Sequence, residues 1–432
     1  MTGAAGGRVR EPRLSWPRVW GTVLVAAATG AGALVVAATR SSTPAVFLGV
    51  GLVAFLLAGG LGLTAQLARL PVSVARRPSA ARGGVALGLT LLAFILTALV
   101  PMGDPRRPPA PVEGQGFWDL ATGSHIAYVH RQADGGSRGR APVVFVHGGP
   151  GVADMRGDSA YFGRLAHDGF DVYVYDSLGT GRSSRLSDPR GYTLGRDVAD
   201  LTAIRERIGA RRLILIGHSY GAVVAASFLA QHPEAVERAV FSSPGGLSSL
   251  EAGGSGNLTG RLTLGERLSL YRQLLWPRAT LAYGLAQLNP PAAHAYVDDP
   301  EMDARYDRIY ARAEPALHCR GAPPGPELHG LGGYASVVRR GSWPALRPAL
   351  AGLPTPALVI KGSCDYLTWA SAVDYLHALP QATLVYLHGA GHNAYQDRPE
   401  RFLADVRAFL AGATPPDVRT DVGRPTDYEG PP

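Results

Sequence analysis

The chain has 432 residues, 46% of them hydrophobic, and a formal net charge of +8 at pH 7. Eleven arginines and only two acidic residues give residues 1–112 a net charge of +9, so the remainder of the chain carries −1. A nucleic-acid-binding domain would need a basic patch outside this N-terminal segment, and the charge distribution disfavours one. The chain has two cysteines and no CxxC or HExxH spacing, so we expect no metal site.

Three long apolar runs occupy the N-terminal part of the chain. No charged residue occurs in residues 19–39, 41–68 or 83–103. A helix rises ~1.5 Å per residue and the hydrocarbon core of a bilayer is ~30 Å thick, so ~20 apolar residues cross it. The sequence therefore predicts a membrane region over residues 1–103, with transmembrane helices at 19–39, 44–68 and 84–101.

A cleaved signal peptide is the alternative interpretation of the first run. That run is longer than the apolar part of most signal peptides, and two more spans follow it. Glycine and alanine are frequent in all three runs. Small residues let membrane helices approach closely, so the helices are expected to pack together or against partners. The lipid bilayer is the expected partner of this region, and no nucleic acid is expected.

The arginines predict the orientation of the membrane region. Four arginines precede the first span and four lie between the second and the third, whereas Arg40 alone lies between the first and the second. Because positively charged loops stay in the cytoplasm, we expect a multi-pass protein of the cell membrane with an extracytoplasmic C-terminal domain. Arg106 and Arg107 oppose this orientation. The proline-rich residues 104–112 are expected to form a short, stiff tether.

From residue 113 onward, apolar strand patterns alternate with amphipathic helical patterns. Near-continuous apolar strands suit a mostly parallel sheet that helices cover on both faces. The sequence therefore predicts an α/β core with eight strands, built from residues 113–245 and 351–412. The strands are expected at 117–121, 125–131, 143–147, 171–176, 212–217, 237–242, 356–361 and 382–387. The helices are expected at 158–167, 194–208, 220–231, 369–378 and 399–410.

Two glycine-rich turns follow predicted strands in this core. The first is HGGPG at 147–151, and the second is GHSYG at 217–221. A G-x-S-x-G sequence between a strand and a helix pushes a serine hydroxyl out of a sharp turn toward a base, so Ser219 is the candidate nucleophile. The N–H groups of Gly149 and Tyr220 form the candidate oxyanion hole, in which each donor contributes about 3–4 kcal/mol.

Two further residues complete a predicted catalytic triad. Asp365 follows the strand pattern of residues 357–360 and is the candidate acid, and His392 lies in a glycine-rich turn and is the candidate base. The order Ser, Asp, His along the chain is that of α/β-hydrolases and differs from those of chymotrypsin and subtilisin. His147 and His218 are expected to be structural, because one base suffices. Acyl transfer by these residues requires no cofactor.

Residues 246–350 lack the strand pattern, and helical stretches are expected there at 263–276, 278–288 and 299–313. This segment is predicted to be a helical cap over the active site, because loops at the carboxyl ends of strands line the crevice of such sheets. Residues 413–432, rich in proline, aspartate and glycine, are expected to be disordered.

The two cysteines lie in different parts of this predicted domain. Cys319 belongs to the cap and Cys364 precedes the candidate acid Asp365. A disulfide between them and a pair of buried free thiols are both compatible with the sequence, which does not give the distance between their Cα atoms.

The HGGPG sequence resembles a loop of proline iminopeptidases and related α/β-hydrolase-fold peptidases. The resemblance covers about residues 113–412, and DSLGTGRS at 176–183 is similar to that family's turn D-x-x-G-x-G-x-S. It implies an α/β-hydrolase fold and a cap carboxylate that receives the free amino group of the substrate. The glutamates of the predicted cap are Glu251, Glu266, Glu301, Glu314 and Glu327.

The preferred hypothesis is a membrane-anchored serine hydrolase that forms an acyl-enzyme and cleaves small peptides with a free N-terminus. The choice of peptides rests on the HGGPG resemblance. A carboxylesterase or lipase acting on lipid-derived esters is the second hypothesis, which the membrane anchor favours. A third hypothesis is a non-catalytic ligand-binding or sensing protein, because a fold does not determine a function. The presence of four catalytic elements argues against the third.

Overall fold

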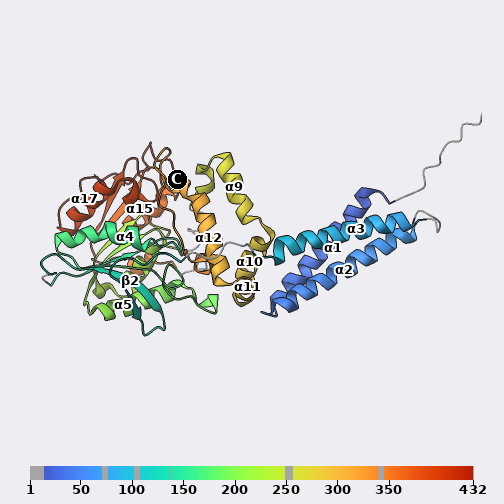
Figure 1. Ribbon diagram of the computed structural model, residues 1–432. Coiled ribbons are helices and arrows are strands. Elements are labelled where there is room, and N and C mark those ends of the chain that lie inside the picture. The colour runs from blue at the N-terminus through green and yellow to red at the C-terminus, as the bar shows by residue number, and fades with distance from the viewer. Residues whose placement is uncertain are drawn as a thin grey trace, which may run out of the picture. The chain divides into compact units, whose positions relative to one another are not determined.

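The computed structural model describes residues 14–70, 76–101, 108–137, 139–248, 256–338 and 345–431. The chain forms two compact units, and Figure 1 labels many of their helices and strands. The first unit combines residues 1–102 with residues 275–297, and the second combines residues 103–274 with residues 298–432. The first part of the predicted tether, residues 104–107, lies outside the described residues.

A nine-stranded sheet forms the centre of the second unit, in the order β1-β2-β4-β3-β5-β6-β7-β8-β9. The strands from β4 to β8 in this order pair in parallel, whereas β1, β2 and β9 run antiparallel to their neighbours. The predicted mostly parallel α/β sheet is confirmed, with one strand more than expected. The strands are β1 (Gln115–Asp119), β2 (His125–Arg131), β3 (Val143–Val146), β4 (Val172–Tyr175), β5 (Leu213–His218), β6 (Val236–Ser242), β7 (Ala357–Gly362), β8 (Ala382–Leu387) and β9 (Val418–Arg419).

Helices cover both faces of this sheet. Phe162 of α4 and Phe402 of α17 belong to one buried apolar cluster with side chains of the central strands, and Figure 1 shows α5 on the opposite face. Four core helices have the predicted bounds. The fifth, α4, begins at Met155 and not at residue 158, because the Asp154 carboxylate accepts a hydrogen bond from the Gly157 N–H and caps the helix. The core helices are α4 (Met155–Phe162), α5 (Leu194–Ile208), α6 (Tyr220–Gln231), α15 (Trp369–Ala378) and α17 (Pro399–Leu410).

Residues 413–431 have defined contacts with the core, which differs from the disorder expected for residues 413–432. Val418 and Arg419 pair with β8 and add the ninth strand. The Glu429 N–H donates to the carbonyl oxygen of Ser363 at 2.8 Å, and Tyr428 is only 3% exposed. The polar composition of the segment indicated disorder. One buried aromatic side chain and a few backbone hydrogen bonds nevertheless hold the segment against the core.

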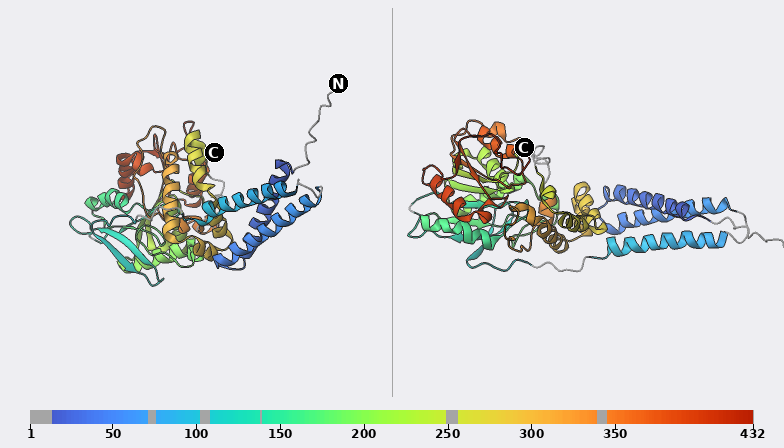
Figure 2. Two further views of the ribbon diagram at one scale, coloured as in Figure 1. Left: turned by 45° about the vertical axis from the view of Figure 1, so that its right-hand side comes forward. Right: turned by 90° about the horizontal axis from the view of Figure 1, so that it is seen from above.

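Three long apolar helices make up most of the first unit and are long enough to cross a membrane. They are α1 (Trp16–Ala38), α2 (Pro44–Ala68) and α3 (Arg76–Phe94), which continues as the π-helix η1 (Ile95–Leu99). α1 and α2 lie side by side (Figure 2), and a Cβ on Gly30 would lie 2.9 Å from the carbonyl oxygen of Gly51. Glycine therefore allows the close approach that the sequence predicts. α3 starts before its apolar run, and Pro78 falls in its first turn, where a proline is tolerated.

The predicted cap does not form a single unit, which corrects the expectation for residues 246–350. Its helices α10 (Pro277–Leu288) and α11 (Pro290–Tyr296) belong to the first unit. Arg278 donates to the carbonyl oxygen of Ala98 at 3.1 Å, and Asn289 donates to that of Ala38 at 2.7 Å. The last carbonyls of a helix lack partners within the helix, so these side chains satisfy the ends of η1 and α1. The other helices of the insertion are α8 (Leu258–Arg261), α9 (Leu264–Leu274), α12 (Asp299–Ala313), η5 (Glu314–Leu317), α13 (Gly333–Val338) and α14 (Arg347–Leu350).

Candidate active site

Ser219 lies at a sharp turn between β5 and α6. Its φ is 54° and its ψ is −116°, a conformation that non-glycine residues adopt only where the surrounding structure imposes it. A Cβ at Gly221 would lie 2.0 Å from the carbonyl oxygen of Val146, and one at Gly217 would lie 2.5 Å from that of Gly221. Both glycines of the predicted elbow are therefore required, because α6 starts against the backbone of β3.

The HGGPG loop lies beside this elbow. It follows β3, which pairs in parallel with β5 so that Val146 is opposite Gly217. Gly149 has a φ of 117°, and a Cβ there would lie 2.5 Å from the nitrogen of Gly151. Gly149 lines the same cavity as Ser219, and Tyr220 is the first residue of α6, at the positive end of its helix dipole. Gly149 and Tyr220 therefore lie beside Ser219, and their role as an oxyanion hole stays a prediction.

Asp365 and His392 meet at the carboxyl ends of β7 and β8. His392 Nδ1 lies 2.8 Å from Asp365 Oδ1, and both side chains are buried. His392 and Ser219 line one cavity, so all three predicted triad residues come together. Within the described part of the chain, the structure gives no hydrogen bond between the Ser219 hydroxyl and His392. Such bonds are often long in the absence of substrate.

Lys361 is a fourth member of this cluster, to which the sequence analysis assigned no role. Its Nζ lies 2.7 Å from Asp365 Oδ2, and both side chains are fully buried. The sequence contained one signal, since Lys361 is the only lysine among 42 basic residues and lies within an apolar strand. A buried lysine is rare unless it is paired, so the ion pair explains why this position carries a lysine.

The pKa of Asp365 is set by opposing influences. Burial alone would raise the pKa, but the charge of Lys361 and the contact with His392 lower it below its usual range. Asp365 therefore stays ionised and accepts the Nδ1 proton of His392, which leaves Nε2 as the proton acceptor. Burial lowers the pKa of Lys361, and the charge of Asp365 opposes that shift. Each residue therefore stabilises the charged form of the other.

The two neighbouring histidines have structural contacts, in agreement with the prediction. Burial, reinforced by the charge of His392, lowers the pKa of His218 to about 3, so His218 is neutral. Its Nε2 lies 3.2 Å from the amide oxygen of Asn393. His147 Nε2 accepts the N–H of Ser177 at 3.0 Å and fixes the DSLGTGRS turn beside the HGGPG loop.

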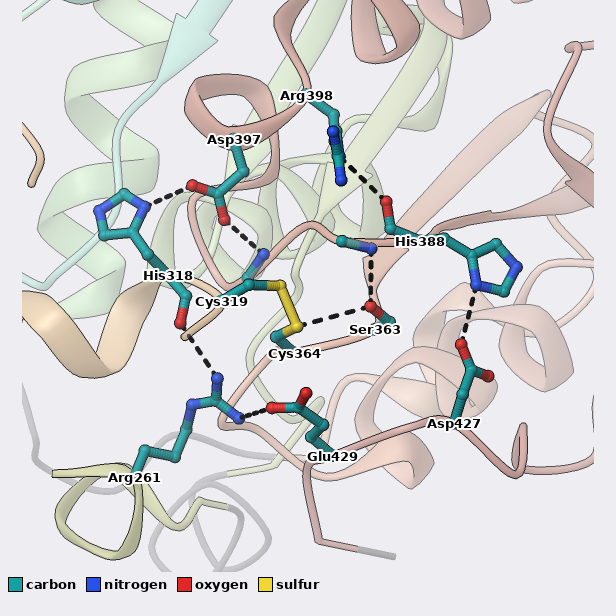
Figure 3. Close-up of a disulfide and its surroundings, with 12 residues drawn as sticks. Arg261, His318, Cys319, Ser363, Cys364, His388, Asp397, Arg398, Asp427 and Glu429 are labelled. Atoms are coloured by element: carbon teal, nitrogen blue, oxygen red, sulfur yellow. Dashed lines mark hydrogen bonds and ion pairs between the residues drawn. A yellow bond between two sulfur atoms is a disulfide. The ribbon is translucent and has the colours of Figure 1, made fainter. Parts of the chain in front are cut away.

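Cys319 and Cys364 form a disulfide, which decides between the two alternatives that the sequence left open. Figure 3 shows this bond together with the ion pair of His318 and Asp397. The disulfide links the cap to the turn that carries Asp365. Asp397 also accepts the N–H of Gly391 at 2.6 Å, directly before His392. The same part of the cap therefore holds both turns of the candidate triad.

His318 is the titratable group of this contact. Its Nδ1 lies 2.5 Å from Asp397 and its Nε2 lies 2.8 Å from Glu314. Burial alone would lower the pKa of His318, but the two carboxylates raise it to about 9.

A raised pKa in the folded state predicts a pH-dependent stability. The contribution of His318 is fully present below the pKa of an unfolded histidine, about 6.5, and is lost as the pH rises through about 9. Thermal unfolding between pH 6 and 10 should show the midpoint falling across this interval in the wild type. The His318→Gln variant should show a flatter profile, and an equal fall in both proteins would contradict the assignment.

The cavity at Ser219 has a volume of about 430 Å³. The insertion contributes mainly apolar side chains to its wall, and the aromatic residues Tyr306 and Tyr310 join them. The apolar wall consists of Leu258, Leu270, Leu274, Ile309, Ala313, Leu317 and Leu328. Among the described residues, no group of three or more His, Cys, Asp or Glu side chains is arranged to hold a metal ion.

Of the predicted amine-binding glutamates, none that the structure describes lines this cavity. The candidates were Glu251, Glu266, Glu301, Glu314 and Glu327. Glu251 lies outside the described residues, and the other four are absent from the cavity wall. Glu266 caps α9 by accepting the N–H of Thr263 at 2.7 Å, and Glu314 is held by His318. The sequence pattern did not show that these carboxylates have partners inside the insertion.

Two aspartates of the core line the cavity instead. Asp158 accepts a hydrogen bond from the Tyr395 hydroxyl at 3.0 Å, and Asp154 caps α4. Burial, and then the neighbouring Asp154, raise the pKa of Asp158 well above its usual range. Burial also raises the pKa of Asp154. The sequence analysis missed both residues, since an aspartate at a helix start has an ordinary structural explanation.

The fold and the site define the class of protein to which this chain belongs. Residues 141–399, more than half of the chain, match the family described as alpha/beta hydrolase fold. The chain is therefore a member of the alpha/beta hydrolase fold family, as the resemblance implied.

Curated relatives carry two kinds of name. Over 132 residues the chain is 35% identical to the proline iminopeptidase of Heyndrickxia coagulans, covering 30% of this chain and 43% of that protein. It is 26% identical over 273 residues to the proline iminopeptidase of Levilactobacillus brevis, covering 62% and 88%. It is 27% identical over 287 residues to the (lyso)-N-acylphosphatidylethanolamine lipase of Mus musculus, covering 62% and 78%. At this level of identity, both peptide and lipid substrates are represented among the relatives.

Proposed function

We propose that this protein is a membrane-anchored serine hydrolase that works through an acyl-enzyme. The Ser219 hydroxyl attacks a substrate carbonyl and transfers its proton to His392 Nε2, while Asp365 stabilises the charged imidazole. The Gly149 and Tyr220 N–H groups bind the oxyanion, and His392 then returns the proton to the leaving group. Water enters and His392 activates it to release the acid. The observation that carries the proposal is the contact of Asp365 with His392 beside the strained turn of Ser219.

The cavity wall favours an ester with an apolar acyl group as the substrate. Seven aliphatic residues of the insertion line the cavity, and burial of apolar substrate surface against them contributes about 25 cal/mol per Å². None of the described cap glutamates lines the cavity to receive an ammonium group. We therefore place the carboxylesterase or lipase hypothesis ahead of the peptidase hypothesis.

A peptidase with a preference for a free N-terminus is the second candidate. The HGGPG loop and the iminopeptidase relatives favour it. Asp154 and Asp158 supply the carboxyl groups of the cavity wall that could bind an ammonium group. A bound ammonium group would favour their ionised forms, because an opposite charge lowers the pKa of a carboxyl group.

Turnover of two substrate types distinguishes these candidates. The full chain in liposomes should hydrolyse p-nitrophenyl esters, with rates that increase from acetate to longer acyl groups, and should not hydrolyse prolyl-arylamide. Turnover of the arylamide alone would favour the peptidase. The Ser219→Ala variant is the control for both substrates, and turnover by this variant would reject the proposal.

We further propose that the second unit is extracytoplasmic. The arginine distribution around the three apolar helices supports this orientation, and so does the disulfide, since disulfides persist in oxidising compartments. A single reactive thiol at the exposed position Ala413 provides the test, because both native cysteines are in the disulfide. A membrane-impermeant maleimide should label Ala413→Cys in intact cells. Labelling only after lysis would reject the orientation.

A further inference from the structure

The helix α9 presents apolar side chains to its exterior. Leu264, Leu268 and Tyr271 are 70%, 61% and 39% exposed. Their spacing of four and three residues places them on one side of the helix. Singly scattered apolar residues are normal on protein surfaces, but a row of large ones on one helix indicates a surface that something covers. We call these three residues the outer face of α9.

An adjoining side of α9 belongs to the candidate active site. Leu270 is 3% exposed and packs with Leu262 and Ala316, and Leu274 packs partly buried against the same cluster. Both Leu270 and Leu274 line the cavity of Ser219. The helix α9 is therefore apolar on two adjoining sides, of which one lies in the wall of the cavity and the other is exposed.

The chain that leaves α9 leads directly to the membrane unit. Only Leu275 and Trp276, both exposed, connect α9 to α10. Within the first unit, hydrogen bonds tie α10 and α11 to the carbonyls of Ala98 and Ala38. These carbonyls lie at the C-terminal ends of the first and third apolar helices, and such ends lie at the surface of the bilayer. α9 therefore ends two residues before a segment that is bound to the ends of the apolar helices.

The side chains around the outer face have the chemistry of a bilayer surface. Tyr271 and Trp276 are amphipathic aromatic residues of the kind enriched at membrane interfaces. Arg272 is exposed beside them and suits lipid phosphate groups. Amphipathic helices that lie in the interface combine leucine and aromatic residues on one face with arginine at its border.

We propose that the outer face of α9 lies in the surface of the bilayer that the chain spans, and that a lipid-derived ester passes beside α9 from the bilayer into the cavity. The inference rests on the proposed function, because it names the source and class of the substrate for the same site. It commits to lipid as the occupant of the outer face. A second copy of the chain or another protein is the alternative that the test must exclude.

Fluorescence at position 268 tests the contact without any measurement of activity. The Leu268→Cys variant of the full chain would be labelled with an environment-sensitive thiol dye and reconstituted in phosphatidylcholine vesicles. We expect a blue-shifted emission that doxyl-labelled phosphatidylcholine quenches. The control is Phe117→Cys, an exposed apolar position on β1, which should show neither change. Equal quenching at both positions, absence of quenching at 268, or cross-linking of 268 to a second protein copy would overturn the proposal.

Activity of a charged variant tests the route of the substrate. The Leu264→Asp/Leu268→Asp variant should hydrolyse soluble p-nitrophenyl acetate at the wild-type rate. Its rate on a long-chain monoacyl ester embedded in the vesicle should fall at least about ten-fold, because the charges weaken insertion of α9 into the interface. Phe117→Asp is the matched control and should match the wild type on both substrates. Equal rates of the α9 variant and the wild type on the embedded ester, or an equal loss on both esters, would overturn the route. Quenching of the dye on the Leu268→Cys variant, together with a wild type that hydrolyses no ester, would reject the proposed function and leave the membrane contact in place.

Discussion

Replacement of Asp365 with asparagine is expected to lower kcat by about 10³- to 10⁴-fold. Asp365 Oδ1 accepts the Nδ1 proton of His392 at 2.8 Å. An asparagine amide group at this position can donate a hydrogen bond to Nδ1, which favours the tautomer with the proton on Nε2. That tautomer cannot take the proton of Ser219. The measurement is the rate of ester hydrolysis by the full chain at saturating substrate.

The asparagine variant also leaves Lys361 without its charged partner, so loss of activity must be separated from loss of folding. Circular dichroism and thermal unfolding should show a folded protein at the assay temperature. The pH profile provides a second control, because a histidine in the wrong tautomer should not recover activity at any pH. A folded Asp365→Asn variant with a kcat within ten-fold of the wild type would contradict the role assigned to Asp365.

Replacement of Lys361 with methionine is expected to destabilise the fold by about 3–5 kcal/mol, because it leaves a buried carboxylate without its partner. The Nζ–Oδ2 distance is 2.7 Å and both side chains are fully buried, so water cannot replace the missing partner. Loss of the positive charge raises the pKa of Asp365, so the acid limb of the activity profile should move to higher pH. Chemical denaturation and a pH–rate profile measure the two effects.

The double variant Lys361→Met/Asp365→Asn distinguishes charge pairing from packing. Removal of both charges should restore much of the stability that Lys361→Met loses, whereas activity should stay at the level of Asp365→Asn. The cycle gives the coupling energy between the two residues. Additive losses of stability in the double variant would show that the pair does not stabilise the fold.

Much of the catalytic core followed from short-range patterns. The elbow at 217–221 and the HGGPG loop each follow an apolar strand, and parallel strands bring such turns to one edge of the sheet. Asp365 and His392 were placed by the same rule and do meet. Four core helices have the predicted bounds because their apolar spacing and their flanking glycine, proline and threonine residues agree.

The features that the sequence did not reveal depend on contacts between distant segments. Lys361 is four residues from Asp365 but is explained only by burial, and the ordered C-terminal segment depends on Tyr428 fitting against the core. The division of the insertion depends on hydrogen bonds from Arg278 and Asn289 to the ends of the apolar helices. Local composition carries no information on such partners.

The central claim is that Ser219 is an activated nucleophile. The most direct test is covalent labelling of the full chain by a fluorophosphonate probe, followed by peptide mass spectrometry. We expect the wild type to carry one probe on Ser219, the folded Ser219→Ala variant to carry none, and the His392→Ala variant to react far more slowly. Equal labelling of the wild type and Ser219→Ala, or an unlabelled wild type that is folded, would contradict the claim.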